Sequence, residues 1–286
     1  MLDIMKNGEN AMRAFETALR IQTANMGNMS TVGYKSLKYS FKTIFNKVLN
    51  AGSAGGSNFG GTNPNQEGSS VAMANITVDF SQGELGSGGQ MDLALKGSGM
   101  FVVTPDEGKT FLYTRAGNFK MSSDGYVLDN SGRKVYGFKS LGNGQFDTGT
   151  MELIKVDVNK ASNAGWQSKG NQGILVENFS QSQSDSSKDK SLFKIALTDF
   201  PNKGALIQHD GTTYKATPAA GIPHKPLPPA EDGMGEAVSQ AIEKSNVFFI
   251  GETVDAMEVQ RAMSASLTAV KIASQQIQNI IQQLGS

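Results

Sequence analysis

Few residues in this sequence have the types and spacing that catalysis or ligand binding requires. Gly108-Lys109-Thr110 ends like a phosphate-binding loop, but such a loop needs a glycine five residues earlier, where Val103 stands. We interpret the tripeptide as a polar turn. The two histidines, His209 and His224, have no partner at the spacing of a metal site or an acid–base pair. The sequence therefore indicates no catalytic, metal-binding or cofactor-binding residue, no cofactor, and a protein that is not an enzyme.

The composition narrows the possible partners. Lys and Arg number 26, Asp and Glu also 26, and cysteine is absent. A formal net charge of zero gives no reason to expect nucleic acid or an anionic membrane as a partner. No apolar run approaches the roughly 20 residues that span a bilayer, so we do not expect an integral membrane protein. The N-terminus lacks the basic region and apolar core of a cleaved signal peptide.

Both ends of the chain have helical periodicity. Residues 2–29 carry one apolar stripe and, beside it, a second one that is rich in alanine. The first stripe contains Met5, Met12, Phe15, Leu19, Met26 and Met29, and the second Ile4, Ala11, Ala14, Ala18 and Ile21. Two apolar faces predict more than one packing neighbour. The methionines suit an ordinary helical core, and they also suit an adaptable interface between subunits.

The C-terminal pattern is the stronger one. Apolar residues recur in steps of three and four over more than four heptads, which is typical of a coiled coil. They are Ala256, Val259, Met263, Val270, Ala273, Ile277, Ile280 and Leu284, with Ser266 as the polar exception. Because a lone helix of this length is marginal in water, we expect the two ends to pair. The predicted inner coiled-coil contacts are Met12, Phe15, Leu19, Met26, Val259, Met263, Val270, Ile277, Ile280 and Leu284.

The middle of the chain has short apolar runs, rich in Val, Phe and Tyr, between Gly, Asn and Ser turns, which predicts strands. The fold class expected is therefore α+β, with N- and C-terminal helices pairing as a coiled coil around a central all-β domain. The predicted divisions are a terminal helical domain (1–30 with 240–286), a Gly-rich connector (31–70), a β-rich domain (71–217) and a Pro-rich linker (218–239).

Four blocks of the sequence, in order, resemble the axial proteins of the bacterial flagellum, the hook and rod subunits. The blocks are "NMGNMSTVGYKS", "DFSQGEL" followed by "MDLALKGSGMFVV", "YTRAGNFKMSSDGYVL" and "SNVFFIGETVDAMEVQRA". The residues that match the family signature are Asn25, Asn28, Thr31, Gly33, Tyr34, Lys35, Ser245, Asn246, Val247, Gln260 and Arg261. Ala24, Gly27, Met263 and Ser264 depart from the usual pattern.

The resemblance implies a structural subunit of the flagellar axial tube, with terminal helices forming an inner layer around the export channel and β domains outside. It implies copies of the chain and other rod, hook and junction proteins as partners. It also implies export through the flagellar type III apparatus without a cleaved signal, and a location in the hook or basal body. On this view the signature residues, Tyr34 and Lys35 above all, contact a neighbouring subunit.

The particular member of the family stays open. The length suits a short hook protein or a rod protein, and the segment after the N-terminal helix looks like that of short hook proteins, so we lean towards the hook. The alternative is a basal-body rod protein, proximal or distal. A secreted adhesin-like binding module with helical ends is a remote alternative, and it predicts a stable monomer that binds a ligand.

At the end of the N-terminal helix, Gly33 is expected to adopt a backbone angle that other residues avoid. Ser30 and Thr31 can stabilise the turn by local hydrogen bonds.

Overall fold

The structure, a computed structural model, describes residues 2–43, 46–55, 60–63, 65–68, 70–142, 144–158, 163–167, 170–177, 179 and 190–284. The chain divides into two compact units. The helical unit comprises Met1–Gly27, Leu37–Thr77 and Phe248–Ser286, and the β-rich unit comprises Asn28–Ser36 and Val78–Val247. The chain therefore crosses between units after Gly27, Ser36, Thr77 and Val247. The prediction of an α+β chain with terminal helices and a mostly β centre is confirmed.

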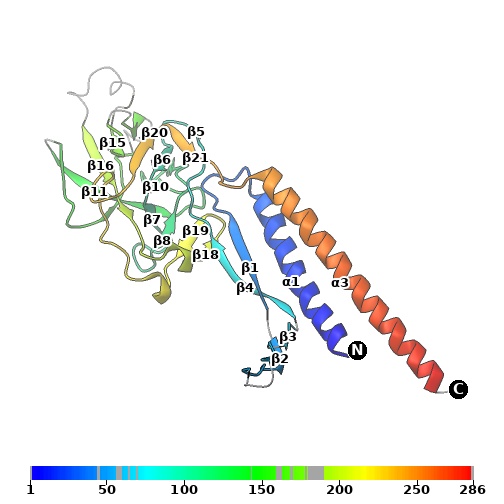
Figure 1. The fold of residues 1–286 in the computed structure, drawn as a ribbon. Coiled ribbons are helices and arrows are strands. Elements are labelled where there is room, and N and C mark those ends of the chain that lie inside the picture. The colour runs from blue at the N-terminus through cyan, green and yellow to red at the C-terminus, as the bar shows by residue number, and fades with distance from the viewer. Residues whose placement is uncertain are drawn as a thin grey trace. The chain divides into compact units, whose positions relative to one another are not determined.

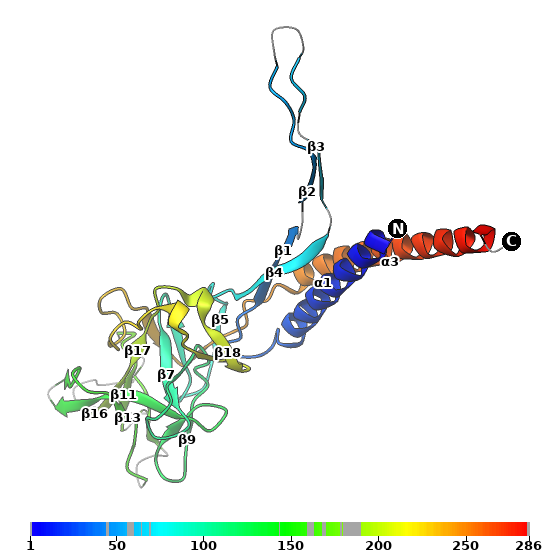
Figure 2. The same ribbon diagram turned by 90° about the horizontal axis from the view of Figure 1, so that it is seen from below.

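The helical unit is built on two long helices, α1 (Leu2–Gly27) and α3 (Phe249–Leu284). They lie side by side in both views (Figures 1 and 2). They run antiparallel, since Gly8 lies against Val270 near one end and Asn25 bonds to Glu252 near the other. Glu252 in the first turn of α3 suits the positive end of the helix dipole. No helix in the described part of the chain is long and apolar enough to cross a membrane.

Two-stranded ribbons complete the helical unit. β1 (Leu37–Thr43) pairs with β4 (Val71–Val78), and β2 (Asn46–Asn50) pairs antiparallel with β3 (Asn65–Gly68). Figure 2 shows the β2–β3 ribbon continuing from the β1–β4 ribbon. Residues 44–45, 56–59, 64 and 69 of the predicted 31–70 connector lie outside the described residues. Part of that connector is thus extended strand and belongs to the helical unit.

The β-rich unit contains a large sheet whose described pairings are antiparallel, as expected for short strands joined by tight turns. Its main path runs β14-β15-β16-β11-β7-β8-β19-β18. The strands on this path are β7 (Met100–Thr104), β8 (Leu112–Thr114), β11 (Lys134–Gly142), β14 (Gly165–Trp166), β15 (Ile174–Val176), β16 (Ser191–Ile195), β18 (Ile207–Asp210) and β19 (Thr213–Lys215). Attached to it are β9 (Lys120–Met121), β10 (Val127–Leu128), β12 (Gln145–Phe146), β13 (Glu152–Leu153) and β17 (Leu197–Thr198).

Two smaller sheets join the end of the β-rich unit to its beginning. β20 (Glu236–Ser239) pairs with β6 (Leu93–Lys96), and β21 (Ala241–Glu243) pairs with β5 (Leu85–Ser87). Two 3₁₀ turns, η2 (Lys203–Ala205) and η3 (Pro218–Ala220), precede them. The last strands of the unit are thus closed against its first.

The core lies within the β-rich unit. All five residues of β7 are buried, and Trp166 is fully buried with its Nε1–H donating to the Met91 carbonyl at 2.7 Å. Strands buried on both faces read as continuous apolar runs, which explains the sequence "MFVVT". The core cluster comprises Leu93, Leu95, Phe101, Val103, Leu112, Phe119, Val127, Val135, Ile154, Val156, Ala164, Trp166, Leu175, Phe193, Ile195, Leu197, Met234 and Ala237.

The predicted Pro-rich linker differs from the structure. Residues 218–239 belong to the β-rich unit, whose boundary falls after Val247 rather than at 217. Met234 and Ala237 are core residues, and Leu227 exchanges backbone hydrogen bonds with Leu197. The prolines therefore restrict an ordered segment packed on the sheet. Composition alone suggested a spacer because proline-rich segments often serve as one.

This packing predicts slow hydrogen exchange where a spacer would exchange fast. The amides of Leu227 and Ala237 donate to the carbonyls of Leu197 and Asn171 at 2.8 and 2.9 Å. We expect both amides to exchange with protection similar to that of β7, measured by amide exchange with NMR or mass spectrometry. Exchange at the rate of an unstructured peptide would contradict this placement.

Candidate functional site

The candidate functional residues form two hydrogen-bonded clusters, one within each unit, and the first and last signature blocks contribute to both. On the helical unit, Asn25 is buried in the last turn of α1. Its Nδ2 donates to the Leu37 carbonyl at 3.0 Å and to Glu252 Oε1 at 2.9 Å. Its Oδ1 accepts from the Leu37 amide at 2.9 Å. One side chain thus joins the end of α1, the start of β1 and the start of α3.

Burial affects the carboxylate that Asn25 contacts. The pKa of Glu252 is raised, mainly because burial penalises its charged form, while the hydrogen bond from Asn25 partly opposes the shift. The bond from Asn25 therefore favours the ionised form of a carboxylate that desolvation disfavours.

On the β-rich unit, residues 28–33 form a tight turn. The Thr31 amide and hydroxyl donate to the Asn28 carbonyl and side chain at 3.1 and 3.2 Å, and the Tyr34 amide donates to the Thr31 carbonyl at 3.3 Å. Gly33 has φ +70°, as expected from the sequence, and its amide donates to the Glu243 carbonyl at 2.7 Å. A Cβ on Gly33 would lie 2.4 Å from the Ala116 nitrogen. Gly33 is needed both for its angle and for this close approach.

Lys35 follows the turn and is completely buried. Its ammonium contacts Glu243 Oε1 at 2.6 Å and donates to the Ser81 carbonyl at 2.7 Å. Glu243 also accepts from the Gly83 amide at 3.0 Å. Arg115, 4% exposed on the other side of Glu243, lies 3.7 Å from Oε2. Burial lowers the pKa of Lys35 and also that of Arg115, and Glu243 opposes both shifts.

Asn246 connects the other two segments at which the chain enters or leaves the β-rich unit, around Ser36 and Asp79. Its Oδ1 accepts from the Ser36 amide at 2.8 Å, and its Nδ2 donates to the Asp79 carbonyl at 2.8 Å. Nδ2 also lies 3.0 Å from Ser81 Oγ. The Asp79 amide in turn donates to the Ser36 carbonyl at 2.8 Å. Segments around residues 36, 80 and 246, far apart in sequence, are therefore fastened together.

The structure corrects the predicted roles of several signature residues. Tyr34 and Lys35 were expected to contact a neighbouring subunit, but both are buried within their own chain, Tyr34 at 2% exposure. Asn25 is also buried. An internal ion pair and hydrogen bonds hold these side chains, so they have no surface left for another molecule. Ser245, Asn246 and Val247 are half-buried, whereas Gln260 and Arg261 on α3 are exposed.

The heptad stripe of α3 coincides with its less exposed side. Val259 and Ala273 are buried, and Met263, Val270 and Ile277 are half-buried. Ile280 and Leu284, 46% and 84% exposed, continue the pattern beyond the start of α1 (Figure 1). The stripe therefore faces α1 along the length that α1 provides.

In α1 the buried apolar residues come from the alanine-rich stripe, although Ile4 of that stripe is exposed. Ala14, Ala18 and Ile21 are buried, whereas the predicted contacts Met12, Phe15, Leu19 and Met26 are half-buried. Small residues let the helix backbones approach. Phe15 instead stacks edge-on against Phe41 of β1, with ring centroids 5.6 Å apart. Phe15 thus packs against the ribbon.

Glu243 and Arg115 were not predicted as site residues. Arg115 stands inside the block "YTRAGNF", between residues of a strand-like run, and a charge in such a run was the signal available. Glu243 gave no comparable signal, because its partner Lys35 lies 208 residues away.

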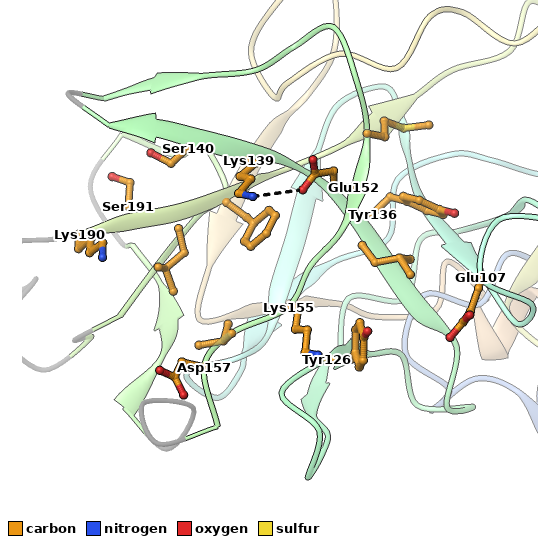
Figure 3. A pocket seen from close by; sticks show the side chains of 15 residues that line it. Glu107, Tyr126, Tyr136, Lys139, Ser140, Glu152, Lys155, Asp157, Lys190 and Ser191 are labelled. Carbon is orange, nitrogen blue, oxygen red and sulfur yellow. Dashed lines mark ion pairs between the residues drawn. The ribbon is translucent and has the colours of Figure 1, made fainter.

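The β-rich unit also has an open pocket of about 820 Å³ (Figure 3). Charges of both signs line it, and Lys139 pairs with Glu152 at 3.8 Å across its wall. The Tyr126 ring lies 4.3 and 4.9 Å from the ammonium groups of Lys134 and Lys155. No group of three potential metal ligands occurs among the described residues. Gly108-Lys109-Thr110 lies between β7 and β8, and both histidines are exposed.

Comparison with known proteins agrees with this architecture. A family model described as "Flagellar hook protein FlgE/F/G D1 domain" matches residues 94–170. The chain is 26% identical over 284 residues to the flagellar basal-body rod protein FlgG of Bacillus subtilis (strain 168), covering 98% of both chains. It is 34% identical over 140 residues to the flagellar hook protein FlgE of Helicobacter mustelae, covering 48% of this chain and 31% of that protein.

The resemblance seen in the four sequence blocks is thus supported over the length of the chain. The chain is similar over nearly its whole length to a flagellar rod protein and over part of its length to flagellar hook proteins. Its relatives are structural proteins of the flagellum rather than enzymes.

Replacing Gly33 by alanine should strongly destabilise the β-rich unit. The substitution combines an unfavourable φ with a Cβ 2.4 Å from a backbone nitrogen, so we expect a loss of about 3 kcal/mol in the free energy of unfolding. Gly132 is the matched control, because it has φ +84° and open space around its Cβ position. Gly132→Ala should cost only about 1 kcal/mol in urea unfolding. Equal losses would refute the close-approach argument.

Alkaline stability should depend on Tyr214. Burial raises its pKa in the folded chain, so the unfolded chain ionises first as the pH rises above about 10. The stabilisation is complete below that pH and falls by about 1.4 kcal/mol per pH unit above it, up to the folded pKa. Tyr214→Phe should make the free energy of unfolding less steep between pH 10 and 11. Parallel curves for the two proteins would contradict this.

Proposed function

We propose that this structural protein of the flagellar hook or rod assembles helically with copies of itself into the axial tube, where it transmits motor torque and encloses the export channel. The observation that carries the proposal is the apolar surface of α3. Single exposed apolar residues are ordinary on a soluble protein, but several of them on one face of a helix indicate an interaction surface.

The exposed apolar residues lie on the side of α3 opposite its heptad stripe, as a group of three near the start of the helix and Ile272 further along. Ile250, Val254, Met257 and Ile272 are 63%, 44%, 50% and 51% exposed. At 100° per residue these positions fall about half a turn from the stripe that contains Val259. Within the described chain, α1 covers only the stripe side. The second apolar side is therefore available to another copy.

The end of α3 supports the same proposal. Ile280, Ile281 and Leu284 are exposed beyond the start of α1. In an assembly, helices of neighbouring copies would cover these residues and complete the coiled coil predicted from the heptads. The terminal helices would then form the inner domain, and the β-rich unit would lie outside it.

The partners follow from the same proposal. Other rod, hook and junction proteins would adjoin this chain in the tube, and the flagellar type III export apparatus would deliver it. The location would be the hook or the basal body.

For the position in the flagellum we propose a short hook protein, with a basal-body rod protein as the second candidate. The higher identity, 34% over 140 residues, is to a hook protein, but that alignment covers 31% of it. The alignment to the FlgG rod protein covers 98% of both chains at 26% identity. The first observation favours the hook, and the second favours the rod.

Changing Ile272 should separate assembly from folding. Because its side chain is already 51% exposed, Ile272→Asp should leave the thermal unfolding of the monomer nearly unchanged. It should raise the critical concentration for polymerisation about tenfold or more, since a carboxylate would have to enter an apolar contact. Sedimentation and electron microscopy of the purified chain measure this.

Ile272→Leu is the control and should polymerise like the native chain. A native chain that stays monomeric at every concentration, or an Ile272→Asp variant that polymerises normally, would argue against the assembly role. Immunogold labelling of purified hook–basal bodies would separate the two positions. Label beyond the outer membrane indicates the hook, and label within the ring region indicates the rod.

A further inference from the structure

In one buried cluster of the β-rich unit, two cations share a single carboxylate. Lys35 and Arg115 are cations with 0% and 4% exposure, and both contact the single carboxylate of Glu243, which is itself 0% exposed. Lys35 makes the short contact at 2.6 Å, and Arg115 lies at 3.7 Å, too far for a hydrogen bond. Arg115 is fixed separately, since its Nη2 donates to the Gly97 carbonyl at 2.5 Å.

These groups come from three different parts of the chain. Lys35 belongs to the 28–36 segment, which enters the β-rich unit between two crossings. Arg115 follows β8 in the body of the sheet, and Glu243 ends β21. Glu243 is positioned by pairing opposite Leu85 of β5. Its own carbonyl accepts the Gly33 amide, so backbone and side chain of Glu243 both hold the 28–36 segment.

The order in which these parts can come together follows from electrostatics. If the 28–36 segment docked while Glu243 was absent, Lys35 would be buried near Arg115 with no carboxylate between them. Two desolvated cations repel each other, and breaking a buried ion pair by removing one partner is strongly destabilising. With Glu243 in place, each cation has a counter-charge within 4 Å.

We propose that β21 is the closing strand of the β-rich unit, and that Glu243 acts as a shared counter-ion which allows the 28–36 segment to dock. The β-rich unit is then not complete until residues near its C-terminal boundary have joined it. The N-terminal crossing and the C-terminal crossing become ordered together.

The proposal predicts an asymmetry that hydrogen-bond loss alone does not. Removing the charge of Glu243 leaves two buried cations, whereas removing that of Lys35 leaves the balanced pair Arg115–Glu243. Glu243→Gln should therefore be far more damaging than Lys35→Met. Moreover, Lys35→Met should partly rescue a chain that already carries Glu243→Gln, because it removes one of the two buried cations that repel each other.

The experiment uses the full chain and four variants: Glu243→Gln, Lys35→Met, the double variant and Glu84→Gln. Amide exchange at Gly33 and Asp79, whose amides bond to Glu243 and Ser36, reports docking of the 28–36 segment. Glu243→Gln should speed this exchange about 100-fold or more, and Lys35→Met less than about tenfold. In the double variant the exchange should be at least about tenfold slower than in Glu243→Gln.

Glu84→Gln is the matched control, because it removes an exposed pair with Lys244, at 3.1 Å, beside the same strands. It should change exchange by less than about threefold. Equal effects of Glu243→Gln and Lys35→Met would overturn the proposal, and so would a double variant worse than Glu243→Gln. If Glu243→Gln does not fold, the double variant must regain the fold measured by circular dichroism, and a double variant that stays unfolded would also overturn it.

Discussion

Lys35 and Glu243 are 208 residues apart and meet at 2.6 Å with no exposed surface on either side chain. Burying an ion pair costs desolvation energy, which only close geometry and further hydrogen bonds offset. Ser81 and Gly83 supply those bonds, and Asn246 fastens the neighbouring backbone. This contact joins the 28–36 segment at the beginning of the β-rich unit to β21 at its end. The segments through which the chain enters and leaves the unit are therefore held by it.

In the helical unit a buried polar side chain also connects distant segments, but the helices keep exposed apolar surface. Asn25 ties α1, β1 and α3 together at one end of the helix pair. Away from that end, small residues of α1 pack against the heptad stripe of α3, as Gly8 does against Val270. The opposite side of α3 and its last turns keep exposed isoleucine, methionine and leucine. The β-rich unit pairs the buried charges of Lys35, Arg115 and Glu243 within one chain, whereas the helices retain apolar surface that suits further copies.

Regular patterns in the sequence were enough for the two terminal helices and for the less exposed stripe of α3, because period and burial are linked within one helix. They were not enough for the packing of α1, where two stripes compete: the deeply buried one is the alanine-rich stripe, since small side chains allow the backbones to approach. The proline-rich segment was misjudged for a similar reason. Its composition resembles a spacer, but pairing of β20 with β6 is a long-range contact that composition does not contain.

The signature turn shows the same limit. Gly33 could be predicted to adopt a positive φ, since local geometry requires it. That Lys35 points into the protein could not, because its counter-ion stands at the other end of the chain. A lysine in a polar turn is normally exposed, and only the tertiary contact with Glu243 makes its burial possible.

We infer that the β-rich unit is complete in one chain, while α1 and α3 complete their packing only between chains. Amide exchange compared between the monomer and the assembled tube tests it most directly. The amides of residues 33 and 79 should be equally protected in both states, and those of α3 should become much better protected in the tube. Helix amides already fully protected in the monomer, or junction amides protected only after assembly, would contradict the account.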